Sequence, residues 1–213
     1  MARPRARLAA AHAHLDGVDP VLDVLMASHG VPRLPGPGPV SRRFHDLAES
    51  IAYQQLNGTA AATIWGRVRA AAGEEVVTPQ RLLDLGPEPL RAAGLSGAKT
   101  RSMLDLSTHV VSGEIVFDRI GRLSDEEVIA RLTPVWGIGR WTAQMFLMFT
   151  LGRLDVWPVG DYGVRAGYGK AWGLDEMPKE QDMEALGERF AGARSLVAWY
   201  CWRAAESGET GRS

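Results

Sequence analysis

Residues 132–143 read LTPVWGIGRWTA and say more about the architecture of this chain than any other segment. The pattern predicts a helix ending near Pro134, a tight turn at 137–139 and a second helix that begins at Arg140. Two glycines flanking one aliphatic residue allow a sharp turn and leave its N–H groups uncovered, at a helix N-terminus that favours an anion. Ile138 is expected to be buried and to anchor the turn. A nucleic-acid phosphate is a natural ligand for such a turn, although an ordinary connection between two helices explains the spacing as well.

Helix signals continue on both sides of this segment, and strand signals are scarce. Ser124, with Glu127 three residues later, forms a capping box. Residues 141–151 are apolar nearly all round, which predicts a buried central helix, and only 114–117 reads as an extended piece. We therefore predict an all-α fold of about ten helices. The other predicted helices lie at 20–28, in two pieces across 44–72 with a break at 54–58, from 79 and from 87 onwards, and at 99–111, 162–171, 183–190 and 195–206.

Composition narrows the classes of protein without identifying a partner. Of the 213 residues, 46% are hydrophobic and 23% charged, which excludes wholesale disorder. The single cysteine, Cys201, excludes a disulfide framework, a thiolate zinc site and an iron–sulfur cluster held by four thiolates. No run of about 18 apolar residues is present to cross a membrane. The net charge is −1, and only three of the 24 basic residues are lysine. Arginine suits phosphate contacts, but a skewed genome composition explains its excess equally well, so charge leaves the partner undecided.

Four segments together resemble a known family. These are 132–143, VWPVGDYGVR at 156–165, IAYQQLNGTAA at 51–61 and LRAAGLSGAKTRSMLDLS at 90–107. Their order resembles the helix–hairpin–helix DNA glycosylases, and GIGRWTA is particularly similar to the DNA-3-methyladenine glycosylase II family. The resemblance implies two helical subdomains with a DNA-binding cleft between them, in a short form that lacks the N-terminal β domain of some relatives.

The resemblance also gives an expected domain plan. Residues 1–14 are expected to be a loose basic tail, and 207–213 a second tail. The helical glycosylase domain is expected at 15–206, with a central subdomain at about 60–165 that carries the hairpin.

Asp161 is the candidate catalytic residue. It lies in the glycine- and proline-containing loop that, in the resembled superfamily, ends in an essential aspartate. An ionised carboxylate stabilises the positive charge that builds on deoxyribose as the N-glycosidic bond breaks, and it can orient or deprotonate water. The residues leave open whether Asp161 is a general base or a counter-ion. The alternative interpretation is that Asp161 is only a helix N-cap. Asp155 is the other nearby candidate for the catalytic carboxylate.

Trp141 determines the subtype that the resemblance implies. Relatives that also cut the DNA strand carry a lysine after the position of Arg140, and tryptophan cannot replace that nucleophile. A monofunctional hydrolase that leaves an abasic site is therefore expected. An indole also attracts a base made cationic by alkylation, although Trp141 may equally be core.

The resemblance extends to a base pocket and a DNA-binding surface. The base would lie among Trp141, Met145, Tyr162 and Tyr53. Two departures from the family affect this pocket. Met145 replaces an aromatic residue, which predicts weaker stacking, and Ala193 replaces a tryptophan, which predicts a wider, more open site. Either Gln55 or Leu56 would fill the gap left by an extruded nucleotide, although a polar break between helices explains this loop as well. The DNA-binding residues would be Gln54, Gln55, Leu56, Asn57, Gly137, Ile138, Gly139, Arg140 and Thr142.

The expected partner is double-stranded DNA containing damaged bases, bound by a monomer in the bacterial cytoplasm and nucleoid. No cofactor and no iron–sulfur cluster are expected. The resemblance suggests a structural Na⁺ or K⁺ held by the main-chain carbonyls of Thr133, Val135 and Ile138. The expected substrates are alkylated purines, 3-methyladenine and 7-methylguanine. The alternatives are a glycosylase for other lesions, such as ethenoadenine, hypoxanthine or a deaminated pyrimidine, and a hairpin protein that binds DNA without turnover.

Overall fold

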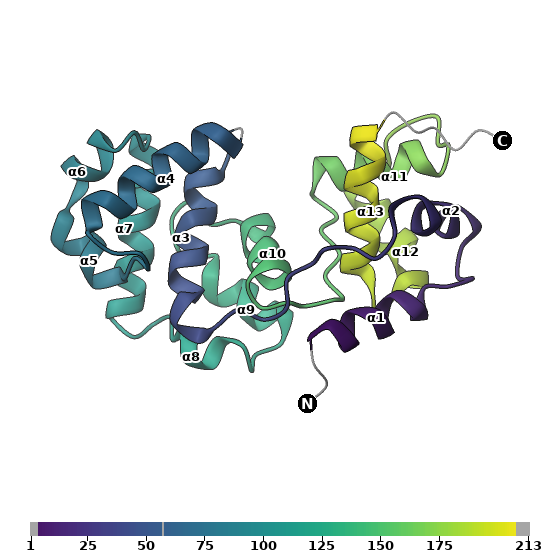
Figure 1. Cartoon of the computed structure of the whole chain (residues 1–213), viewed down its shortest axis with the longest axis horizontal. Coiled ribbons are helices and arrows are strands. Elements are labelled where there is room, and N and C mark those ends of the chain that lie inside the picture. The colour runs from purple at the N-terminus through teal and green to yellow at the C-terminus, as the bar shows by residue number, and fades with distance from the viewer. Residues whose placement is uncertain (1–3, 57, 208–213) are drawn as a thin grey trace. The chain divides into compact units, whose positions relative to one another are not determined.

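The computed structural model describes residues 4–56 and 58–207, and they fold as helices joined by turns and loops (Figure 1). The all-α prediction is confirmed. The chain divides into two compact units: Gly38–Leu151 forms one, and the segments up to Pro37 and from Gly152 form the other. We call them the hairpin unit and the terminal unit. In the described part of the chain no helix has the length and apolar character needed to span a lipid bilayer.

The hairpin unit is built around α3 (Arg43–Tyr53), whose buried face includes Leu47, Ala48 and Ile51. Helices α4, α7 and α10 pack against it, and α5 and α6 pack against α7. The remaining bounds in this unit are η1 Val40–Arg42, α4 Gly58–Ala72, α5 Pro79–Leu85, α6 Pro87–Ala92, α7 Gly97–Val111, α8 Phe117–Ile120, α9 Asp125–Leu132 and α10 Arg140–Phe149.

Local sequence signals explain most of these boundaries. The capping box is present, because the Ser124 side chain accepts the Glu127 N–H while the Glu127 carboxylate accepts the Ser124 N–H. Thr78 caps α5, which has a proline in its first turn, and Ser96 caps α7. The break between α3 and α4 lies where Asn-Gly predicts it.

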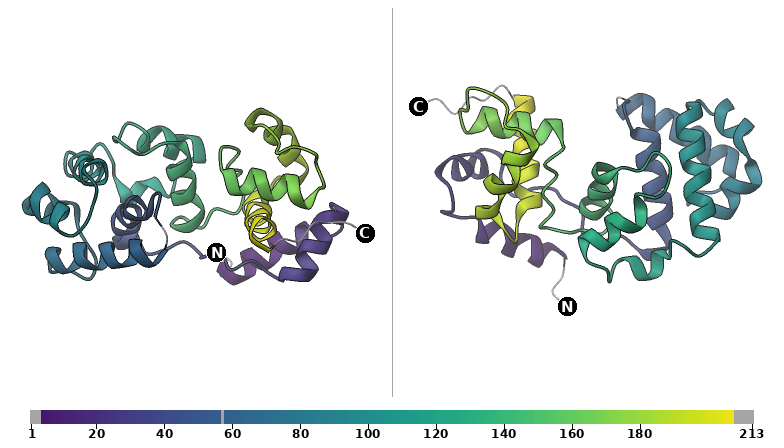
Figure 2. Two further views of the ribbon diagram at one scale, coloured as in Figure 1. Left: turned by 90° about the horizontal axis from the view of Figure 1, so that it is seen from above. Right: turned by 180° about the vertical axis from the view of Figure 1, so that it is seen from behind.

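The terminal unit is centred on α13 (Arg194–Ser207), which packs against α11 and α2, as the views in Figure 2 show. The approach of α11 (Tyr162–Ala171) to α13 is so close that a Cβ on Gly167 would lie 1.8 Å from the carbonyl oxygen of Cys201. Only glycine fits there. The other elements are α1 Pro4–His14, α2 Pro20–His29, α12 Glu180–Gly187 and η2 Glu188–Phe190.

The domain plan differs from the expectation in two places. Residues 4–14 form α1 instead of a loose tail, because their alanine-rich sequence favours a helix and His14 Nε2 lies 3.0 Å from the Ala191 carbonyl oxygen. The unit boundaries lie at 37/38 and 151/152 instead of near 60 and 165, because α3 packs with the hairpin. Residues 1–3 and 208–213, which include most of the expected C-terminal tail, lie outside the described residues.

Two expectations about elements are also corrected. Residues 114–117 contain no strand: they form a bend after α7, an extended residue at Val116 and the first residue of α8. Helix α10 is not buried all round, because the face that carries Trp141 and Phe149 lines a cavity instead of packing into the core. Trp141 is 43% exposed and Phe149 is 41% exposed.

Candidate active site and nucleic-acid interface

The turn between α9 and α10 has the geometry expected of the hairpin. Gly137 has a φ of +80°, and a Cβ at this position would lie 3.0 Å from the Ser102 hydroxyl, so both the backbone conformation and the space require glycine. The Ile138 side chain is buried, as predicted. The carboxylate of Asp105 accepts the Trp136 N–H at 2.7 Å, which ties the turn to α7.

The N-terminus of α10 is uncapped by any side chain. Gly139 is its N-cap residue, and no atom lies within 4 Å of the position that a Cβ would take there. Arg140, the first residue of α10, forms a two-pronged ion pair with Glu126, including a 2.9 Å bond from Nη1 to Oε2. Hydrogen bonding from Arg140 lowers the pKa of Glu126. The ion pair fixes the Arg140 guanidinium beside this helix start.

The loop after α3 is joined to the hairpin by one side chain. The Gln54 amide nitrogen donates to the Thr142 hydroxyl at 3.1 Å and to the Gly137 carbonyl at 3.4 Å. Gln54 and Thr142, both expected at a DNA interface, therefore also have partners within the protein. Lys99 Nζ donates to the Ala52 carbonyl at 2.8 Å and fixes the end of α3.

Gln55 and Leu56, either of which is expected to fill the gap left by an extruded nucleotide, differ in backbone conformation and in side-chain exposure. Gln55 is the non-glycine residue with a left-handed φ, +56°, among those described, and Leu56 is an exposed apolar side chain. Both residues line a cavity in the hairpin unit. The structure does not distinguish which of them would fill the gap left by an extruded nucleotide. Asn57 lies outside the described residues.

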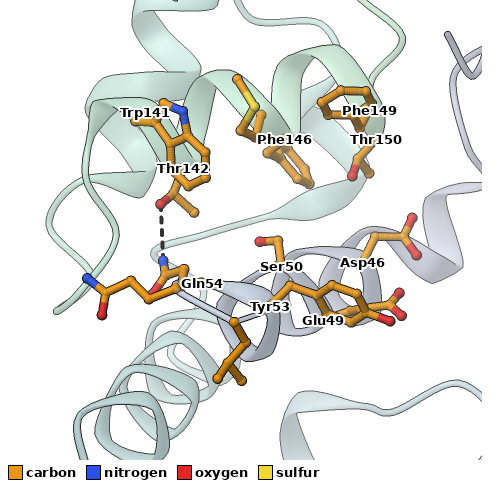
Figure 3. A pocket seen from close by; sticks show the side chains of 13 residues that line it. Asp46, Glu49, Ser50, Tyr53, Gln54, Trp141, Thr142, Phe146, Phe149 and Thr150 are labelled. Atoms are coloured by element: carbon orange, nitrogen blue, oxygen red, sulfur yellow. Dashed lines mark hydrogen bonds between the residues drawn. The ribbon is translucent and has the colours of Figure 1, made fainter. Parts of the chain in front are cut away.

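This cavity of about 730 Å³ lies between α3 and α10 (Figure 3). Trp141, Met145 and Phe149 line it at i, i+4 and i+8, so they share one face of α10. Tyr53 lies on the α3 side. The structure thus brings together three of the four residues predicted for the base pocket. The fourth, Tyr162, lies in the terminal unit and is 74% exposed.

The sequence interpretation missed several residues of this cavity. Phe149 could have been found from its spacing with Trp141 and Met145. Asp46 and Glu49 lie on α3, on the turns preceding Tyr53, and line the same cavity. Their place on an amphipathic helix gave no signal that separates them from solvated surface carboxylates.

Asp161 caps α11 in the terminal unit. Its Oδ1 accepts the Val164 N–H at 2.8 Å and the indole N–H of Trp202 at 2.9 Å, and the residue is 8% exposed. Asp161 is therefore both a helix cap, as the alternative interpretation predicts, and a carboxylate held in a fixed orientation. Trp202 was not predicted, because nothing in the pattern of its helix indicates which group its indole contacts. Ala193, where the family resemblance leads us to expect a tryptophan, is fully buried.

The rival aspartate has another role. Asp155 forms a bidentate ion pair with Arg194, with Nε–Oδ1 at 2.7 Å and Nη2–Oδ2 at 2.8 Å. Burial opposes ionisation of Asp155, but the hydrogen bonds from Arg194 outweigh burial and lower its pKa. This pair joins the loop before Trp157 to the start of α13.

Two groups of residues bring together atoms of the kind that bind metal ions. His45, Asp46 and Glu49 bring their ligand atoms within 4.8 Å of one another. His45 Nδ1, however, accepts the Val77 N–H at 3.0 Å, and burial lowers the pKa of the ring. A neutral imidazole with its proton on Nε2 has no lone pair left for a metal. The second group is the hairpin carbonyls.

At the hairpin, the Val135 carbonyl accepts the Ile138 N–H at 3.0 Å, and Thr133 ends α9 as its C-cap residue. A carbonyl oxygen has two lone pairs, so this bond leaves Val135 one for a cation. The donor set of neutral carbonyl oxygens suits a hard, weakly bound cation such as Na⁺ or K⁺.

Residues 48–191 match the HhH-GPD superfamily of base excision DNA repair proteins. The chain belongs to this superfamily. It is also 36% identical over 162 residues to DNA-3-methyladenine glycosylase 1 of Schizosaccharomyces pombe, an alignment that covers 75% of this chain and 71% of that protein. The match places this HhH-GPD chain in the 3-methyladenine DNA glycosylase family, as the motifs predicted.

Solved structures agree with this assignment. The S. pombe 3-methyladenine DNA glycosylase Mag1 in complex with abasic DNA superimposes with a TM-score of 0.82 at 34% identity, covering 91% of this chain and 95% of that one. A DNA-3-methyladenine glycosidase from Bacillus halodurans gives a TM-score of 0.75 at 33% identity, covering 91% and 92%. The HhH-GPD fold therefore accounts for nearly the whole chain.

Proposed function

We propose that this chain is a DNA glycosylase of base excision repair that removes alkylated purines from double-stranded DNA. One observation carries the proposal: nearly the whole chain matches, at 34% identity, a 3-methyladenine DNA glycosylase whose structure contains abasic DNA. Abasic DNA is what remains when the N-glycosidic bond to a base has been hydrolysed.

Asp161 is the proposed catalytic carboxylate. Water adds to the anomeric carbon, the C–N bond breaks with its electrons going to the base, and one proton of the water is released. A carboxylate stabilises the cationic sugar and orients this water. The two hydrogen bonds to Oδ1 support the proposal, because they hold the carboxylate in one orientation before substrate arrives.

The cavity of the hairpin unit is the proposed base pocket. A methylated purine that carries a positive charge is attracted to the electron-rich face of an indole, and Trp141 is exposed at this cavity. Two further apolar side chains on the same helix face, Met145 and Phe149, extend the surface available for stacking. A cationic purine is already a good leaving group, so no residue is assigned as a dedicated acid.

The turn at 137–139 and the start of α10 are the proposed phosphate contact. A glycine N-cap without a side chain in front of it allows close approach of the DNA backbone. The carbonyls of Thr133, Val135 and Ile138 would hold the Na⁺ or K⁺, whose charge would offset that of a phosphate. We further propose that the protein acts as a monomer and without a redox cofactor.

The experiment is base release from methylated duplex DNA. The wild-type protein is expected to release free 3-methyladenine and 7-methylguanine, measured by chromatography, and to leave an intact strand containing abasic sites. Because Trp141 is not a lysine, borohydride should trap no covalent protein–DNA adduct. Release of neither base, from a protein that still binds the duplex, would favour the non-catalytic alternative, and a trapped adduct would contradict the monofunctional assignment.

A further inference from the structure

The cavity between α3 and α10 has two chemically different walls (Figure 3). Helix α10 supplies an apolar wall that includes Trp141 and Phe149. Helix α3 supplies Asp46 and Glu49, and residues 46, 49 and 53 are spaced three and four apart, so they lie on one face of that helix. An aromatic wall stacks on any flat base and adds a modest attraction for a cationic one, whereas a carboxylate adds a full opposite charge for a positive ring and offers a neutral ring none.

Glu49 has no partner of its own. In the range 4–56 and 58–207, no group donates a hydrogen bond to its carboxylate and no cation pairs with it within 4.0 Å. Its ligand oxygen lies within 4.8 Å of that of Asp46. Asp46 is partly compensated, because Arg42 Nε lies 3.6 Å from its Oδ1.

The surroundings of Glu49 disfavour the ionised form of its carboxyl group. Burial raises the pKa of Glu49, the neighbouring Asp46 raises it further, and the more distant Arg42 and Arg69 lower it. Burial also raises the pKa of Asp46. The adjacent His45 adds no compensating charge, because burial lowers its pKa. Two adjacent half-buried carboxylates cost folding free energy, and Glu49 neither caps a helix nor closes an ion pair in return.

We propose that Glu49 is a specificity-determining residue that makes the cavity select cationic purines over neutral lesions. This inference rests on the proposed function. A ring with a positive charge compensates the Glu49 carboxylate as it enters, and it stacks on the aromatic wall at the same time. A neutral ring covers the same carboxylate without compensating it, which costs desolvation free energy.

The carboxylates of Asp46 and Glu49 therefore strengthen the preference for a cationic ring beyond what stacking on Trp141 supplies. A 7-methylguanine base in DNA is a cation, whereas ethenoadenine and hypoxanthine are neutral. Hypoxanthine also presents an N–H donor and ethenoadenine does not, so the two neutral lesions separate the effect of charge from that of hydrogen bonding.

The experiment compares Glu49→Gln with the wild type in single-turnover release of 7-methylguanine, hypoxanthine and ethenoadenine from otherwise identical duplexes. The variant keeps the size and polarity of the side chain and removes its charge. We expect release of 7-methylguanine to fall roughly 10- to 100-fold, the range for a lost hydrogen bond to a charged group. Release of the neutral lesions should stay the same or rise.

Two further variants serve as comparisons. Asp46→Asn should shift the same ratio by less, because Arg42 already offsets that charge. Glu184→Gln removes one negative charge from an exposed position of α12 and should leave the ratio unchanged. Thermal unfolding checks folding: Glu49→Gln should melt at or above the wild-type temperature, because it removes a charge that burial disfavours. Equal loss for all three lesions, or no loss for any, overturns the proposal.

A binding measurement keeps this inference separate from the proposed function. Quenching of tryptophan fluorescence reports binding near Trp141 and needs no turnover. At pH 6, 7-methylguanosine is a cation and inosine is neutral. The wild type should bind 7-methylguanosine more tightly, and Glu49→Gln should lose most of that preference, with the remainder supplied by Trp141. A wild type that prefers 7-methylguanosine but releases no base contradicts the proposed function alone; a wild type without this preference contradicts the role of Glu49.

Discussion

Helices α10 and α11 begin in opposite ways, although each follows a glycine-containing turn. The N-cap residue of α10 is Gly139, with no side chain at the cap and open space where a Cβ would lie. Helix α11 starts at Asp161, whose carboxylate accepts the Val164 N–H and is further held by Trp202. The first start leaves room for an external anion, and the second supplies its own. One type of backbone feature thus leaves open space at a helix start in one unit and fixes a carboxylate in the other.

The start of α11 gives the largest expected effect. Asp161→Asn should keep the helix cap, because asparagine caps about as well as aspartate, so unfolding free energy should change by less than about 1 kcal/mol. The charge is lost, and release of 7-methylguanine should fall by at least about 100-fold. Single-turnover kinetics and thermal unfolding, measured on the same preparation, test this.

Asp161→Ala completes that comparison by removing the cap as well. It should be as inactive as the asparagine variant and about 1 kcal/mol less stable. If Asp161→Asn retained full activity, the carboxylate would be a cap alone and the catalytic assignment would be wrong.

The next largest effects are expected at the start of α10, where Gly137 and Gly139 have different surroundings. Gly137→Ala forces a side chain into a left-handed backbone and against Ser102, which should cost about 1–3 kcal/mol of stability. Gly139→Ala meets no atom within 4 Å and should fold normally. It should nevertheless weaken binding to abasic-site duplex, because its methyl group covers the end of the helix.

Denaturant unfolding and equilibrium DNA binding separate these two variants. Unchanged DNA affinity in Gly139→Ala would mean that no phosphate approaches this helix start. In that case the hairpin would be a connection between helices, and the contrast with α11 would lose its functional meaning.

Trp202→Phe tests whether the indole positions the Asp161 carboxylate. The variant keeps an aromatic ring on α13 and removes the donor to Oδ1, so base release should slow by about tenfold, the effect of one hydrogen bond to a charged group. DNA affinity should not change. Trp199→Phe is the matched control on the same helix, because its ring packs against His29 and Tyr200. If both variants slow release equally, Trp202 only stabilises the helix.

The sequence predicted the parts of this comparison that depend on local signals. The hairpin glycines, the Ser124–Glu127 capping box and the break after Tyr53 each follow from neighbours a few residues apart. The sequence likewise indicated that Asp161 could cap a helix. Its partner Trp202 was not, because the two residues are 41 positions apart and meet only when α11 packs on α13.

The cavity shows the same limit on prediction. Trp141 and Met145 were expected at a pocket, but the whole of α10 was expected to be buried. Hydrophobic periodicity indicates which residues avoid water, and it does not indicate whether protein or a ligand covers them. The carboxylate of Glu49 was missed for a related reason, since a charged residue on an amphipathic helix is usually solvated.

The smallest expected effect comes from a second aspartate of the terminal unit, Asp155, which is bound to Arg194 instead of acting as an N-cap like Asp161. Because the ion pair lowers the pKa of Asp155 in the folded state, its stabilisation is present above the ordinary aspartate pKa, about 3.9, and is lost as pH falls through the lower folded value. The pair is partly exposed, so it is worth less than about 1 kcal/mol. Asp155→Asn should therefore lower the melting temperature slightly at pH 7 and by progressively less as the pH falls below about 3.9, while base release at pH 7 stays near the wild-type rate. A large loss of base release in Asp155→Asn at neutral pH, without a matching loss of stability, would show that the rival aspartate takes part in catalysis and would weaken the assignment of Asp161.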